Sequence, residues 1–137
     1  MATFLAHLRV KPGQEAEFER TAVALRAATL EHETGMLRYE YWRGREPGTY
    51  YTLASFEDFD AFIEHQTSEH HESIGKELMT FVDDMTFEWV DPITAASPLP
   101  STDEQPLPVG AGETAARYHE RFAIREGAWW KALRLGG

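Results

Sequence analysis

The fold of this chain is constrained most by the order in which two hydrophobic periodicities follow one another. Apolar residues alternate with polar ones, a pattern that predicts β-strands, over residues 3–10, 36–43, 49–56 and 85–90. Over residues 14–32, and again from residue 58, apolar residues recur every three to four positions, which predicts helices. The second helix is expected to break near Thr67 and to resume over residues 68–78. The resulting order is strand, helix, strand, strand, helix, strand.

This order predicts an α+β, ferredoxin-like fold of the split βαβ type. Its four-stranded antiparallel sheet carries both helices on one face. The other face would lie in water, although it holds apolar side chains such as Leu5 and Trp42. Pairing of two sheets face to face buries these side chains, and closed two-fold dimers are the commonest oligomers. We therefore expect a homodimer in which two domains form an α/β barrel.

The chain divides into three parts by composition. Residues 1–92 contain the full order of strands and helices and are expected to form the domain. Residues 93–112 hold four prolines among Ser, Thr, Ala and Gly, which is typical of an extended linker. Helical spacing returns in residues 113–137, a C-terminal helical extension with Trp129 beside Trp130. We expect it to dock on its own domain or on its dimer mate, and the alternative is a tail that binds another protein.

Composition excludes several classes of function. The chain has no cysteine, which rules out disulfides, thiolate metal sites and a cysteine nucleophile, and which fits a reducing cytoplasm. The formal net charge of −10 opposes contact with phosphate backbones, so we expect no nucleic-acid partner. No run of about 18 apolar residues is present, and the first residues already have the pattern of a strand. We therefore expect a cytoplasmic protein with neither a membrane span nor an export signal.

The start of the second predicted helix carries the most informative segment. Residues 56–70 read Phe-Glu-Asp-Phe-Asp-Ala-Phe-Ile-Glu-His-Gln-Thr-Ser-Glu-His, and they place His65 and His70 after an aromatic residue and an acidic pair. This segment resembles the antibiotic biosynthesis monooxygenase family, as do Lys11-Pro12-Gly13 and Glu33-Thr34-Gly35. The resemblance covers residues 3–92. It implies a dimeric α/β barrel and, among characterised relatives, oxygenases that hydroxylate phenolic or quinol-like polycycles without metal or flavin.

His65 and His70 are the candidate catalytic residues. A neutral imidazole can take a proton from a phenol or an activated carbon, and the resulting anion can give one electron to dioxygen without a cofactor. We therefore predict a cofactor-independent monooxygenase that acts on a small aromatic substrate. The side chains expected to form flat apolar walls for that substrate are Tyr39, Tyr41, Tyr50 and Phe62.

Two alternatives stay open at this point. The two histidines can instead cap or bridge the broken helix by hydrogen bonds alone. The protein can also be a non-catalytic dimeric barrel that binds a small metabolite or a protein through its C-terminal helix. His70 and His71 are adjacent and point about 100° apart on a helix, so at most one of them is expected in a site. His7 lies on the face opposite the helices, where a structural role is expected.

Metal and haem chemistry are not expected. His65, His70 and Glu69 lack the spacing of a tight helical ligand pair and an ordered third ligand. Haem-degrading relatives use an asparagine and a tryptophan where this chain has Ala6 and His65. The family's usual Glu-x-Trp at the end of the third strand is Ala54-Ser55-Phe56 here, so any role of that glutamate is lost.

Overall fold

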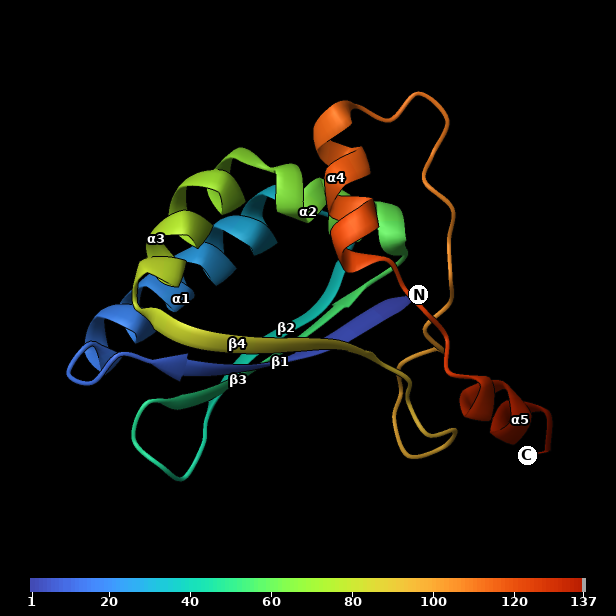
Figure 1. The fold of residues 1–137 in the computed structure, drawn as a ribbon, viewed down its shortest axis with the longest axis horizontal. Helices are drawn as coiled ribbons and strands as arrows, with labels where there is room; N and C mark the ends of the chain where they lie inside the picture. The colour runs from blue at the N-terminus through green and yellow to red at the C-terminus, as the bar shows by residue number, and fades with distance from the viewer. Residues whose placement is uncertain (137) are drawn as a thin grey trace.

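The computed structural model describes residues 1–136 and contains the predicted order of elements (Figure 1). The strands are β1 (Ala2–Val10), β2 (Met36–Arg43), β3 (Thr49–Phe56) and β4 (Val82–Val90). The helical segments are α1 (Glu15–His32), α2 (Phe59–Thr67), the π-helical η1 (His71–Gly75), α3 (Lys76–Thr80), α4 (Glu113–Phe122) and α5 (Ala128–Gly136). None of these helices is long and apolar enough to cross a membrane. Gly137, the last residue of the expected extension, lies outside the described residues.

The strands form one antiparallel sheet in the order β2-β3-β1-β4. β1 lies inside the sheet, where Leu5 faces Leu53 on one neighbour and Glu88 on the other. Helices α1, α2 and α3 lie together on one side of this sheet (Figure 1). The predicted α+β, ferredoxin-like fold is therefore confirmed. β4 begins three residues earlier than its alternation suggested, at Val82.

The second helix breaks where its sequence predicts, at Ser68. This residue has an extended ψ of 152°, and its hydroxyl donates a hydrogen bond to the carbonyl of His65 over 2.7 Å. The Ser68 hydroxyl oxygen also accepts a hydrogen bond from the backbone N–H of His71 over 3.2 Å. Ser68 therefore ends one helix and satisfies a free donor at the start of the next. His65 and His70 consequently lie on two separate helical segments.

Aromatic side chains dominate the core between the sheet and the helices. Phe4, Ala6, Leu8 and Val10 point inward from β1, as their alternation predicts, and all four are buried. Phe62 of α2 is fully buried and lies edge-on to Trp89 at a centroid distance of 4.9 Å. Further rings surround it, namely Phe4, Phe56, Phe59, Phe87 and Phe122. This cluster fixes α2 on the sheet.

The opposite face of the sheet carries exposed apolar residues. Trp42 on β2 is 58% exposed and Leu5 on β1 is 38% exposed. Tyr51 lies on β3, the strand between these two. No helix among residues 1–136 covers the centre of this face (Figure 1). Thr3 is the exception to the alternation, because Thr102 from the segment after β4 packs over it and accepts a hydrogen bond from its N–H.

The C-terminal segment docks on the domain through two short helices rather than one. α4 packs against α2, and the Trp89 indole of β4 donates a hydrogen bond to the carbonyl of Phe122 at the end of α4 over 2.7 Å. The chain then runs extended before α5, whose Arg134 pairs with Asp91 and donates to the carbonyl of Thr102. Of the tryptophan pair, Trp129 stays exposed, whereas Trp130 is partly buried against the core.

Candidate functional site

The candidate site forms where the backbone after α1 passes close to α2. The C-terminal end of α1 turns at Gly35, where an added Cβ would lie only 2.6 Å from the Cβ of Ala61 on α2. Glycine is therefore required at this turn, and its carbonyl also accepts a hydrogen bond from the N–H of Glu57. The turn brings Glu33, which caps α1, next to the side of α2 that carries His65.

Glu33 joins the two histidines. Its Oε2 lies 2.9 Å from Nδ1 of His65 and also within hydrogen-bond distance of Nε2 of His70. All three side chains are removed from water, with exposed fractions of 5% for Glu33, 4% for His65 and 12% for His70. Buried charged and polar groups require such partners, so these contacts explain how a glutamate is held at this depth.

Glu33 is a carboxylate at neutral pH. Burial alone would raise the pKa of this carboxyl, but hydrogen bonds and charge interactions with His65 and His70 outweigh burial and leave the pKa lowered. An ionised carboxylate can only accept hydrogen bonds. Nδ1 of His65 must therefore carry the proton in this pair, and Nε2 is the ring nitrogen that remains for other chemistry.

A cavity of about 340 Å³ lies between the sheet and the helices, and His65 and His71 both line it. Its floor is apolar and comes mainly from the inner side of the sheet, with Phe4, Ala6, Leu8, Met85 and Phe87. Tyr41 and Thr52 are hydroxyl-bearing residues among the same walls. Within residues 1–136, Nε2 of His65 makes no hydrogen bond. His65 thus offers a free ring nitrogen to an otherwise largely apolar cavity.

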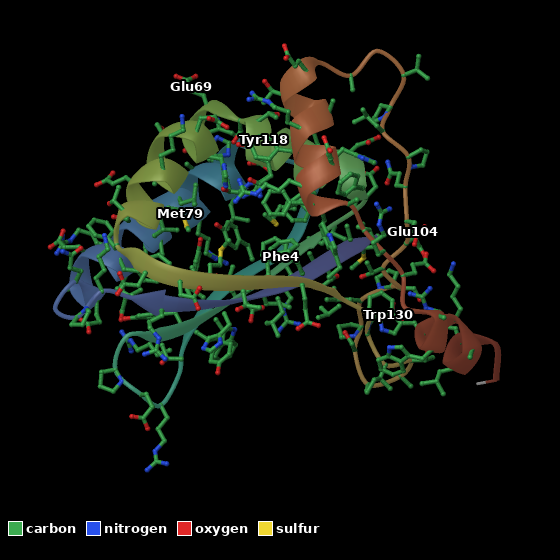
Figure 2. The ribbon with its side chains drawn as sticks, in the orientation of Figure 1. Phe4, Glu69, Met79, Glu104, Tyr118 and Trp130 are labelled. Atoms are coloured by element: carbon green, nitrogen blue, oxygen red, sulfur yellow. The ribbon has the colours of Figure 1, made fainter. Side chains whose placement is uncertain are left out.

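Helix α4 of the C-terminal extension closes one side of this cavity. Tyr118 and Phe122 line it, and the Tyr118 hydroxyl donates a hydrogen bond to Glu72 over 2.9 Å. Figure 2 shows Tyr118 pointing from α4 toward the helices that follow the break. The extension therefore supplies part of the candidate site as well as a cover for the core.

His71 reaches the cavity because the helix is locally widened. It begins the π-helical η1, and π-helical turns occur often at functional sites. Its ring lies against Gly75, where a Cβ would be 3.3 Å from the ring, and stands edge-on to His65 at 4.8 Å between centroids. Burial, assisted by the nearby His65, lowers the pKa of His71 to about 4. His71 is therefore neutral at pH 7.

This lowered pKa predicts a stability change with pH. Well above pH 6.5, the ordinary pKa of a histidine side chain, His71 is neutral in the folded and unfolded chains alike. As the pH falls from 6.5 toward 4, the unfolded chain takes up this proton before the folded chain does, so the free energy of unfolding should decrease by about 3 kcal/mol. Urea denaturation of the protein and of His71→Gln measures this decrease. The measurements run from about pH 7.5 to about pH 4.5, a range that spans the titration of an unfolded histidine. The variant should show a flatter profile, and parallel profiles would contradict the assignment.

The expected site residues lie in four different surroundings. His65 and Tyr41 line the cavity, whereas His70 lines a surface depression on the other side of Glu33. Tyr39 and Tyr50 line a groove between α1 and β2, which Tyr41 also borders. Phe62 lies in the aromatic core behind the cavity. The Tyr39 and Tyr41 hydroxyls lie 2.6 Å apart, and burial raises the pKa of Tyr41 to about 12, so its hydroxyl stays protonated.

Sequence reasoning did not place Glu33 and His71 in the site. Glu33 stands in the Glu-Thr-Gly segment that resembled the family, but its contact with α2 depends on how α1 ends. Glu69, the carboxylate considered for a metal site, makes no ion pair within the described chain. Ala6 lines the cavity at the position where haem-degrading relatives carry asparagine. The Ser55 hydroxyl forms a hydrogen bond with the Thr3 hydroxyl over 2.7 Å.

Residues 1–77 match the family model of the antibiotic biosynthesis monooxygenases. The match spans more than half of the chain, so this protein belongs to the antibiotic biosynthesis monooxygenase family, as the segment around His65 predicted. α4 and α5 lie beyond the matched residues.

Solved structures agree with this membership. A Caulobacter crescentus protein assigned to the antibiotic biosynthesis monooxygenases is 26% identical, with a TM-score of 0.63 over 67% of this chain and 89% of that one. A Methanosarcina mazei protein (23% identity, TM-score 0.61, 65% and 89% covered) and a Pseudomonas aeruginosa protein (22%, 0.60, 67% and 93%) share the fold. A comparison with curated proteins gives no match.

Proposed function

We propose that this protein is a cofactor-independent monooxygenase that oxidises a phenolic or quinol-like aromatic small molecule, with His65 as the base. The observation that carries the proposal is the buried pair of Glu33 and His65, which leaves Nε2 of His65 free at an apolar cavity. Family membership supports oxygen chemistry in general. The substrate class and the role of His65 are our inference from the geometry.

The pair has the arrangement of an oriented general base. Glu33 fixes the Nδ1–H tautomer of His65 and stabilises the imidazolium that forms when Nε2 takes a proton. The cavity falls within the size range of small-molecule sites, and its aromatic and aliphatic walls suit a flat ring system. The protonated Tyr41 hydroxyl can orient a substrate oxygen within the same cavity.

The reaction balances without an added reductant. Nε2 of His65 removes a proton from the activated carbon, and the carbanion gives one electron to dioxygen. The carbon radical and superoxide then form a C–O bond, and the proton returns from His65 to the peroxide. Loss of water leaves a ketone, so a CH₂ group and O₂ become C=O and H₂O, with one oxygen atom in each product.

Oxygen uptake tests the proposal directly. The purified protein, supplied with anthrones and hydroquinones in a buffer containing a metal chelator, should consume one O₂ for each molecule of an anthrone-type substrate. With ¹⁸O₂, one label should enter the product carbonyl. A rate equal to that of buffer across the whole panel would reject the oxygenase assignment and favour a barrel that only binds ligands.

We also propose that two copies pair through the exposed sheet face. Trp42 and Leu5 form its apolar surface, and their exposure in the single chain is what a second sheet would cover. Trp42→Glu should convert the dimer to a monomer in analytical ultracentrifugation, because a charge would be buried without a partner. Val23→Glu, at an exposed position on α1, is the matched control and should leave the dimer intact. A monomeric parent protein would overturn this proposal.

A further inference from the structure

Three ligating atoms converge on the side of His65 that faces away from the cavity. A carboxylate oxygen of Glu33, Nδ1 of His65 and Nε2 of His70 all lie within 4.8 Å of one another. The three residues come from the end of α1, from α2 and from the segment after the break at Ser68. All three side chains are mostly buried, and this burial holds them in position relative to one another.

We propose that Glu33, His65 and His70 form a binding site for a divalent transition metal ion of the zinc type. Two imidazoles and one carboxylate are a ligand set that zinc takes in proteins when the fourth position is left to water. The two hydrogen bonds that now converge on Glu33 mark where the ion would sit. Each histidine can present a lone pair there after its proton moves to the other ring nitrogen.

The ion reaches this site from the surface rather than through the cavity. His70 and Glu33 line a surface depression together with Glu64, Ser68 and Glu69. Figure 2 shows Glu69 pointing outward from the helical layer. Glu64 and Glu69 add negative charge around the entrance in a chain whose net charge is already −10, which favours approach of a cation. Glu33, rather than Glu69, supplies the carboxylate ligand.

Metal binding has a consequence for the cavity, and this consequence rests on the proposed function. Coordination through Nδ1 leaves the proton of a neutral His65 on Nε2. That nitrogen then faces the cavity as a donor and cannot accept a proton from a substrate. The ion therefore switches off the base without touching the substrate, and zinc should inhibit oxygen uptake.

Equilibrium dialysis with ZnCl₂ tests the site without any substrate. The full chain should bind one Zn²⁺ saturably, and Co²⁺ in its place should give the visible bands of a four- or five-coordinate ion. His70→Ala should weaken binding by more than about 100-fold, beyond the loss typical of residues that only support ligands. Glu69→Gln, the control at the entrance, should change affinity by less than about threefold, because it acts only through screened charge.

Two results would overturn the site. One is the absence of saturable one-to-one Zn²⁺ binding by the parent protein when its circular dichroism spectrum shows that it is folded. The other is unchanged affinity in His70→Ala, which would place the ion on surface carboxylates. If His70→Ala does not fold, Glu33→Gln and the Co²⁺ spectrum of the parent give the same decision. Zinc binding without oxygenase activity would leave this site standing and reject the proposed function, whereas activity without zinc binding would do the reverse.

Discussion

Replacing His65 by alanine is expected to lower the rate of oxygen uptake by about 10²–10⁴-fold, the usual contribution of a positioned general base. The loss should appear equally in kcat and kcat/KM with KM little changed, because proton removal is stabilised only in the transition state. Steady-state oxygen electrode measurements on an active anthrone or hydroquinone check this expectation.

The matched control for that variant is His32→Ala. His32 lies at the exposed end of α1 and outside the cavity walls, and its ring stacks on His70 at 5.8 Å between centroids. Because substitutions at exposed positions usually change the folded structure little, its loss should leave turnover within about twofold. Equal turnover in His65→Ala and the parent, or a change confined to KM, would show that His65 only shapes the cavity.

Phe62→Ala is expected to lower the free energy of unfolding by about 3–5 kcal/mol, the cost of removing a buried aromatic ring. Phe62 is fully buried among aromatic rings from the sheet, from α2 itself and from α4. A loss of this size is a large part of the total stability of a single domain, about 5–15 kcal/mol. Urea denaturation at a fixed protein concentration measures it.

Val23→Ala provides the comparison for the core variant. Val23 is a large apolar residue on α1 that stays exposed, so its truncation should change the free energy of unfolding by less than about 0.5 kcal/mol. A small effect of Phe62→Ala, similar to that of Val23→Ala, would mean that the aromatic cluster is not the centre of the core.

The fold could be predicted from the sequence because its signals are local. Phe4, Ala6 and Leu8 alternate with exposed neighbours along β1, and this period assigns both the strand and its buried face. The helix break at Ser68 was also expected, since the apolar spacing lapses at Thr67. The two-helix form of the tail was not expected, because residues 113–137 show one helical spacing and the interruption after Phe122 is set by packing on Trp89.

The site was only partly accessible from sequence because its contacts are long-range. Glu33 and His65 are 32 residues apart, and they meet because Gly35 lets the end of α1 approach Ala61. His71 turns toward the cavity because η1 is π-helical, a detail that no periodicity specifies. From a regular helix we expected at most one of His70 and His71 in a site and chose His70, whereas His71 lines the cavity and His70 lies on the other side of Glu33.

The central claim is that Glu33 holds His65 as the Nδ1–H tautomer, with Nε2 free at the cavity. Long-range ¹H–¹⁵N correlation spectra of the histidine rings, recorded at neutral pH on metal-free protein, test this claim without a substrate. We predict a protonated Nδ1 and an unprotonated Nε2 for His65, and loss of this preference in Glu33→Gln. A proton on Nε2 of His65 in the parent protein would contradict the account.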